Sequence, residues 1–113
     1  MHEVSLVESM VALVEDERRR QHFSRVRTMH VHVGTLGHVE PDALRFCFEA
    51  VTRGTIADGA KLTIETIAGE GHCSDCNQTV PIDDRFAACP LCGSEHVRMT
   101  AGDELRLAEL EVE

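Results

Sequence analysis

The chain has 113 residues, a length typical of one small domain, and it is acidic. Its 20 Asp and Glu against 11 Lys and Arg give a formal net charge of −9, which disfavours binding to phosphate backbones. With four Phe and no Trp or Tyr, it offers few rings on which bases could stack. These numbers exclude a large multidomain enzyme and argue against a nucleic-acid partner. The five Cys and seven His are then the most informative residues.

The N-terminal sequence gives no sign of a secretion signal, because Glu3 is acidic and a basic segment and a small-residue cleavage site are both missing. No stretch approaches the roughly 20 apolar residues that a membrane span needs. We therefore expect a cytoplasmic protein with no membrane partner. In that compartment thiols stay reduced, so paired cysteines indicate metal ligands before disulfides.

The first half of the chain predicts a helix, a strand and a second helix. Apolar residues at helical spacing predict an amphipathic helix over residues 5–20, with Ser5 and Glu8 as a capping box. Residues 1–3 would then form a short free arm. Alternating apolar residues over 25–33 predict a half-buried strand that Gly34 ends.

The second helix is expected to begin at an acidic, proline-containing segment and to end at Gly54. Its first residues are Glu40, Pro41 and Asp42. Its apolar face consists of Leu44, Cys47, Phe48 and Val51. Two later runs, 61–68 and 104–112, have strand-like composition.

The order of these elements predicts an α+β fold in which two helices pack on a small three-stranded sheet. A segment of different composition, residues 69–100, interrupts the last two strands and predicts an inserted zinc-ribbon-like module. We expect residues 1–68 and 101–113 to form the main domain. The insertion suggests that the two strands flanking it are antiparallel neighbours.

The inserted segment contains two Cys-x-x-Cys pairs, and each pair can offer two sulfurs from one tight turn. The four cysteines are Cys73, Cys76, Cys89 and Cys92. Four thiolates complete a tetrahedral zinc site, which leaves no open position for substrate and therefore indicates a structural metal. Mononuclear iron is a weaker alternative, as are unligated thiols or disulfides.

The other cysteine and the histidines near the module have simpler interpretations. Cys47 lies on the apolar face of a predicted helix, so we expect an inert buried thiol. His72 and His96 flank the cysteine pairs and are able to replace a thiolate as ligand. Because four cysteines already complete a zinc site, we favour exposed loop histidines.

The N-terminus carries a second possible metal site. The α-amine of Met1, the His2 amide nitrogen and the His2 imidazole can close two chelate rings around one ion. A nitrogen-rich, planar set of donors suits Ni(II) or Cu(II), with the Glu3 amide nitrogen, water or another imidazole completing the square. A histidine at position 2 of an arbitrary protein is usually only solvated, so this signal alone is weak.

Four stretches of the sequence together resemble the HypA/HybF family of nickel metallochaperones, which act in [NiFe]-hydrogenase maturation. They are the opening MHEVSLVESMVALVE, the central VGTLGHVEPDALRFCFEAVTRGTIADGAKLTIE, the four-cysteine segment with CPLCGS, and the closing GDELRLAELEVE. The resemblance implies a nickel site at the N-terminus and a structural zinc site. It also implies nickel transfer with the GTPase HypB to the hydrogenase large subunit.

Carried over by position, the resemblance makes Met1, His2 and Glu3 the nickel-binding residues and the four cysteines the zinc ligands. Glu40 matches a position where relatives often place an acid near the nickel site, so it is a second-shell candidate. Some relatives have Glu after the glycine of the first strand, where this chain has Thr35.

The remaining histidines of the first half are secondary candidates. His38 is a possible fourth nickel ligand, although we favour a loop histidine. His30 and His32 share one face of the first predicted strand, and we expect them to be exposed or to face a partner rather than to bind a metal.

Three classes of function compete on these observations. The leading hypothesis is a nickel carrier that is not an enzyme. The alternative is a zinc-ribbon protein that binds nucleic acid or is associated with transcription, but Arg85 and Arg98 are the only Lys or Arg in residues 71–98. The third class, a metalloenzyme, lacks a nucleophile beside a base, a phosphate loop and HExxH spacing.

Overall fold

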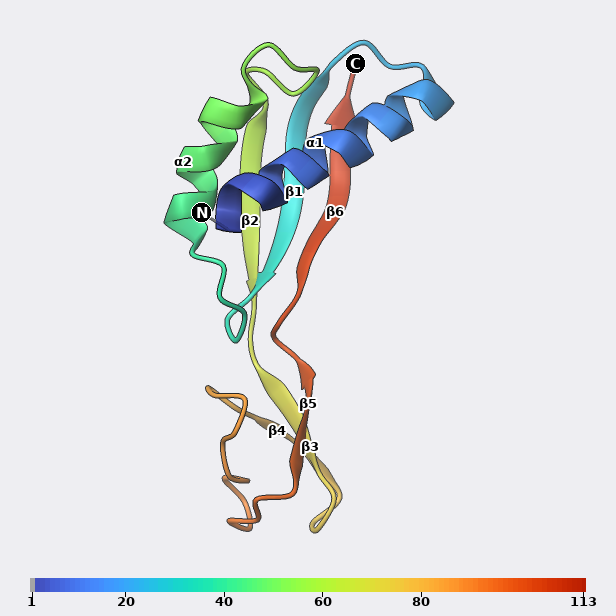
Figure 1. The fold of residues 1–113 in the computed structure, drawn as a ribbon. Coiled ribbons are helices and arrows are strands. Elements are labelled where there is room, and N and C mark those ends of the chain that lie inside the picture. Colours follow the sequence, from blue (N-terminus) through green and yellow to red (C-terminus); the bar gives the residue numbers. More distant parts are fainter. Residues whose placement is uncertain (1) are drawn as a thin grey trace. The chain divides into compact units, whose positions relative to one another are not determined.

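The structure is a computed structural model that describes residues 2–113, except for the side chain of His2. Figure 1 shows its helices and strands. In chain order they are α1 (His2–Gln21), β1 (Val26–Gly34), α2 (Pro41–Thr52), β2 (Lys61–Ile67), β3 (Glu70–Cys73), β4 (Gln78–Pro81), β5 (Val97–Ala101) and β6 (Leu105–Val112). The predicted α+β class, with two helices and small sheets, is confirmed.

Helix α1 begins at His2, so the prediction of a free arm is wrong for residues 2 and 3, while Met1 lies outside the described residues. The capping box predicted at Ser5 and Glu8 is also wrong, because both residues lie inside the helix. Glu3 places a negative charge in the first turn, where it complements the positive end of the helix dipole. Its carboxylate also accepts a hydrogen bond from the Glu40 backbone N–H at 3.4 Å. The start of α1 is therefore stabilised at Glu3 rather than at a Ser5 cap.

Helix α2 follows the sequence prediction closely. Glu40 is its N-cap, and the side chain of Glu40 accepts a hydrogen bond from the Asp42 backbone N–H. Pro41 occupies the first turn, where a missing N–H costs nothing. Cys47 lies on the buried face with 4% of its surface exposed, which confirms the expectation of a buried thiol.

The first sheet has the strand order β2-β1-β6, so the prediction that β2 and β6 are neighbours is wrong. Strand β1 is central in this sheet, and its buried side chains Met29, Val31 and Val33 line one face of the strand. Figure 1 shows α1 crossing in front of this sheet. Within the first unit α1 also packs against α2.

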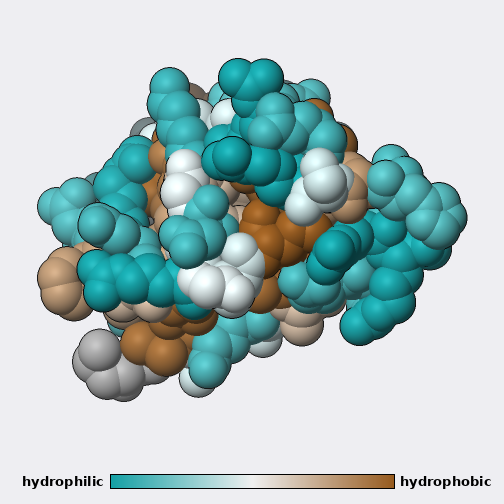
Figure 2. Space-filling view, turned by 90° about the horizontal axis from the view of Figure 1, so that it is seen from above, coloured by the Kyte–Doolittle hydropathy of each residue, from teal (hydrophilic) through white to brown (hydrophobic). Residues whose placement is uncertain are grey.

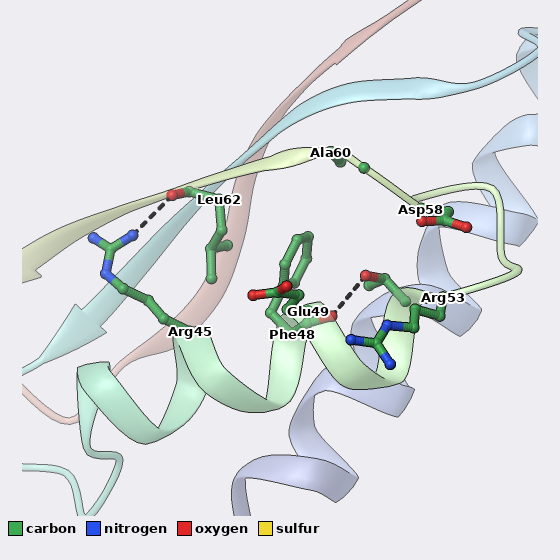
Figure 3. Close-up of a pocket in the computed structure, with 9 residues that line it drawn as sticks. Arg45, Phe48, Glu49, Arg53, Asp58, Ala60 and Leu62 are labelled. Atoms are coloured by element: carbon green, nitrogen blue, oxygen red, sulfur yellow. Dashed lines mark hydrogen bonds between the residues drawn. The ribbon is translucent and has the colours of Figure 1, made fainter.

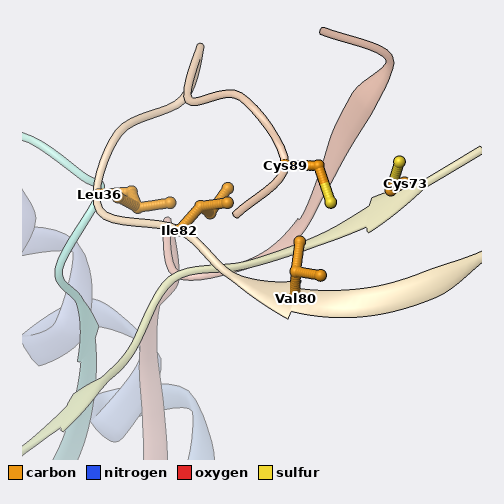
Figure 4. Packing of buried hydrophobic residues seen from close by; sticks show 5 residues of the cluster. All are labelled: Leu36, Cys73, Val80, Ile82 and Cys89. Atoms are coloured by element: carbon orange, nitrogen blue, oxygen red, sulfur yellow. The ribbon is translucent and has the colours of Figure 1, made fainter. Parts of the chain in front are cut away.

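The chain divides into two compact units. The second consists of residues His32–His38 and Thr66–Leu105, and the remainder forms the first. A second sheet of order β4-β3-β5 lies in the second unit, with both pairings antiparallel. Its small hydrophobic core contains Leu36, Cys73, Val80, Ile82 and Cys89. In Figure 4 this cluster extends from Leu36 and Ile82 to the two cysteine side chains, with Val80 between them.

Gly69 lies in the second unit at a position with no room for a side chain. A Cβ atom there would lie 2.3 Å from the Ile82 carbonyl oxygen and 2.7 Å from a Leu36 methyl carbon. The Gly69 carbonyl also accepts a hydrogen bond from the Ile82 N–H at 3.1 Å. Because one of the clashing atoms belongs to the backbone, a rotamer change cannot relieve the contact.

We expect Gly69→Ala to destabilise the metal-loaded protein by about 1–3 kcal/mol, measured by urea unfolding. Gly37→Ala is the matched control, because a Cβ at Gly37 would meet its nearest atoms at 3.6 Å, an ordinary contact. Equal unfolding midpoints for the two variants would contradict the close packing at Gly69.

The face seen from above in Figure 2 is largely hydrophilic, with hydrophobic side chains visible only in limited areas between polar ones. This agrees with the high content of charged residues, 27% of the chain. Among residues 2–113, no helix has both the length and the apolar character that crossing a membrane requires.

Candidate metal sites

The second unit brings the four predicted cysteine ligands together. Their sulfur atoms all lie within 4.8 Å of one another. The Sγ atoms of Cys73 and Cys92 are 3.6 Å apart, and those of Cys76 and Cys89 are 3.8 Å apart. These separations are too long for disulfide bonds of about 2.05 Å. All four thiols are free.

Strand pairing and tight turns position the sulfurs. Cys73 ends β3 and pairs with Gln78 on β4, so Cys76 lies in the turn that joins the two strands. On the other side of the site, the Gly93 N–H donates to the Cys89 carbonyl at 2.8 Å, and the Leu91 N–H donates to the Cys89 sulfur at 3.4 Å. Each Cys-x-x-Cys pair therefore presents two sulfurs from one compact turn.

The thiols differ in acidity. Hydrogen bonding from the Cys76 backbone N–H, helped by the Asp75 N–H and the Cys92 thiol, lowers the pKa of Cys73 to about 7. Burial, together with hydrogen bonds to the neighbouring thiols, raises the pKa of Cys76 to about 12. The Cys73 thiol therefore ionises more readily than that of Cys76. A cation is needed to hold the rest of the cluster as thiolates, because binding it displaces their protons.

The sulfur cluster fits a tetrahedral metal. Bonds of about 2.3 Å from zinc to sulfur place the corners of a tetrahedron about 3.8 Å apart. The observed separations of 3.6 and 3.8 Å are close to that value. The four cysteines therefore fit a metal such as zinc, with iron as the other ion that four sulfurs suit.

The nickel site predicted at the N-terminus is described only in part. Met1 and the His2 side chain lie outside the described residues. Glu3 lies in the first turn of α1, and the hydrogen bond from Glu40 to its carboxylate joins this turn to the start of α2. Glu3 and Glu40, the two acidic residues predicted at the nickel site, are thus neighbours within the first unit.

The histidine side chains that the structure describes take varied positions, and the four-cysteine cluster includes none of them. His30 is half-buried and bridges two strands, with Nδ1 2.5 Å from the Thr63 hydroxyl and Nε2 2.7 Å from the Glu111 carboxylate. His32 is also half-buried, whereas His38 is exposed. The two contacts of His30 are partners that the sequence pattern did not indicate.

The histidines that flank the cysteine pairs make hydrogen bonds within the second unit. Nε2 of His72 lies 3.2 Å from the Asn77 side-chain oxygen. Nδ1 of His96 lies 3.0 Å from Asp75, which also accepts a hydrogen bond from Ser94. Both hydrogen bonds lower the pKa of the Asp75 carboxyl, and the bond from Ser94 has the larger effect. Sequence reasoning missed Asp75 and Ser94, although Asp75 lies inside one Cys-x-x-Cys pair and Ser94 follows the other.

A pocket of about 430 Å³ lies between α2 and β2 in the first unit (Figure 3). Its charged lining residues are Arg45, Glu49, Arg53 and Asp58. Arg45 donates a hydrogen bond to the Leu62 carbonyl at 3.0 Å, so its guanidinium stabilises the edge of the sheet. The charges are mixed, and the pocket contains no thiol or imidazole that would add to either metal site.

Geometry and fold together define a small α+β protein with a tetrathiolate module. Comparison with known proteins identifies the family to which this chain belongs. The family model described as "Hydrogenase/urease nickel incorporation, metallochaperone, hypA" matches residues 1–112. The chain is 68% identical over 113 residues to the hydrogenase maturation factor HypA of Methylocella silvestris, with all of both chains covered. It is 53% identical over 112 residues to HypA of Rhizobium leguminosarum bv. viciae, with 99% of each covered.

Solved structures agree with this assignment. The solution structure of the Ni metallochaperone HypA from Helicobacter pylori has 26% identity and a TM-score of 0.71, covering 97% of this chain and 96% of that one. Another solution structure, of a HypA protein, has 28% identity and a TM-score of 0.75, covering 99% and 96%. The chain belongs to the HypA family, and the resemblance inferred from its sequence is confirmed.

Proposed function

We propose that this protein is a nickel metallochaperone that binds Ni(II) through Met1, His2 and Glu3 and passes it on during hydrogenase maturation. The hydrogen bond that joins Glu3 to the start of α2 is the observation that carries this proposal, together with membership of the HypA family. It supports a defined place for the N-terminal donors beside Glu40. Glu40 acts as a nearby acid that orients them rather than as a ligand.

The start of a helix suits this chemistry. The first N–H groups of a helix have no carbonyl one turn earlier to bond to. The His2 amide nitrogen can therefore release its proton to solvent and bind a metal without breaking a hydrogen bond inside α1, which begins at that residue. An amine, an amide nitrogen and an imidazole in one plane suit Ni(II). Cellular supply then decides between Ni(II) and the more tightly held Cu(II).

The four-cysteine site has a different role in this proposal. It holds Zn(II) with all four positions filled by protein, so it shapes the second unit and takes no part in carrying nickel. We take residues 69–100 as the zinc module and residues 1–68 with 101–113 as the nickel-binding domain. The protein then carries one exchangeable metal and one resident metal, and it transforms no substrate.

The proposed partners are the GTPase HypB and the large subunit of [NiFe]-hydrogenase, in the cytoplasm. The names of the relatives in Methylocella and Rhizobium describe hydrogenase maturation factors, which supports a hydrogenase as the destination. A candidate surface for HypB is the last turn of α1, which carries three arginines. Each pairs with an acidic residue three positions earlier, as in the Arg18–Glu15 pair at 3.7 Å. Pull-down of HypB with charge-reversed Arg18 and Arg19 tests this surface.

Calorimetric titration of Ni(II) into the untagged, zinc-loaded protein tests the nickel site. We expect His2→Ala to weaken binding by about a hundredfold, because it removes the imidazole that anchors the planar set of donors. His22→Asn is the matched control at the other end of α1. His22 is exposed with φ of 56°, a conformation that Asn tolerates. Equal affinities of His2→Ala and the unchanged protein would refute the proposal.

A further inference from the structure

Asp75 connects the two cysteine pairs of the second unit. It lies in the turn between Cys73 and Cys76, whereas its hydrogen-bond partners follow Cys92 in the chain. Ser94 donates its hydroxyl hydrogen to Oδ2 of Asp75, and Nδ1 of His96 lies 3.0 Å from the same oxygen. One carboxylate oxygen therefore links the first cysteine turn to the segment beyond the second.

Ser94 continues this link to the second cysteine pair. Its carbonyl accepts a hydrogen bond from the Cys89 N–H at 2.8 Å. Its hydroxyl oxygen accepts one from the His96 N–H at 3.0 Å. A backbone hydrogen bond from the Ser74 N–H to the His96 carbonyl at 3.1 Å closes the loop next to Asp75. The two pairs are thus joined by a continuous set of hydrogen bonds outside the sulfur cluster.

We propose that Asp75 and Ser94 form a latch that holds the two cysteine pairs together and thereby slows the loss of the metal. A metal leaves a four-sulfur site one bond at a time, so a sulfur that has detached must move away before the next bond breaks. The latch keeps the two turns in place, and a detached thiolate then rebinds before a competing ligand can enter. Asp75 is a positioning residue in this role, because its carboxylate bonds to Ser94 and His96 rather than to a metal.

The latch gives the second unit a means of keeping its metal that does not depend on the sulfur atoms alone. The inference goes beyond the proposed function, and it concerns the second unit alone. Its test uses zinc without nickel, so the latch and the nickel carrier can fail independently.

The experiment measures the rate at which the zinc-loaded protein transfers zinc to an excess of a chromophoric chelator. We expect Asp75→Ala and Ser94→Ala each to speed release about tenfold, because each removes a charge-assisted hydrogen bond of the latch. The double variant should be no faster than the faster single variant, since both changes break the same link. The Co(II) spectrum of each variant should keep its tetrahedral thiolate bands.

Asp84→Ala is the matched control. Asp84 lies in the same unit and accepts a hydrogen bond from the Phe86 N–H at 2.7 Å, but that bond lies within one loop and joins no cysteine pairs. We expect release from this variant within twofold of the unchanged protein. Equal acceleration by Asp84→Ala would indicate a general effect of charge and would overturn the latch, as would unchanged release from Ser94→Ala. If Asp75→Ala loses its cobalt bands, Ser94→Ala, which keeps the charge, decides the question.

Discussion

Cys89→Ala is expected to abolish metal binding by the second unit and to unfold it. The unit has only a small hydrophobic core, and Cys89 belongs both to that core and to the sulfur cluster. Zinc binding contributes about 10–16 kcal/mol to the folding of small zinc-finger peptides, far more than such a core supplies. Elemental analysis and amide NMR spectra of the purified protein measure the two effects, with zinc falling from one ion per chain to none.

Cys47→Ala is the control for this prediction, because Cys47 is a buried cysteine on α2 that lies outside the sulfur cluster. We expect it to retain one zinc per chain and an unchanged spectrum for the second unit. A full zinc content and a dispersed spectrum in Cys89→Ala would show that the cysteine cluster does not hold the unit together.

Extending the chain by Gly-Ser-Gly-Ser before Met1 is expected to weaken nickel binding by about a hundredfold or more. The extension turns the free amine one residue before His2 into an amide, so the chelate ring between that amine and the His2 amide nitrogen loses its terminal donor. The same four residues added after Glu113 provide the control and should leave the affinity unchanged. Titrations of both extended proteins with Ni(II) measure the effect of the extension, and equal affinities would contradict a role for the amine.

Nickel binding by the unchanged protein should also weaken as the pH falls, because the nitrogen donors must lose their protons.

The sequence was sufficient to predict the elements whose residues follow one strong pattern. Alternation in β1 and the proline after Glu40 were local signals, and both elements formed as expected. The start of α1 could not be predicted in the same way. It depends on the contact between Glu3 and Glu40, which lie 37 positions apart. The order of the first sheet likewise depends on how strands compete for the central position, and the pattern of one strand does not reveal this.

The four-cysteine site could likewise be predicted only in part. The spacing of four cysteines predicts their convergence, because two tight turns can present their sulfurs only to a common point. The packing of Leu36 into the core of the second unit had no signal, since it is a single apolar residue in a loop. The link from Asp75 to Ser94 was also unpredicted, although an acid inside one cysteine pair and a serine just after the other gave a usable hint.

Nickel-edge X-ray absorption on the untagged protein, loaded with one zinc and one nickel per chain, tests the central claim most directly. Planar binding by Met1, His2 and Glu3 predicts a nickel ion surrounded only by nitrogen and oxygen, and the imidazole part of that signal should disappear in His2→Ala. A shell of sulfur neighbours around nickel, unchanged by His2→Ala, would place the cargo among the cysteines and contradict the account.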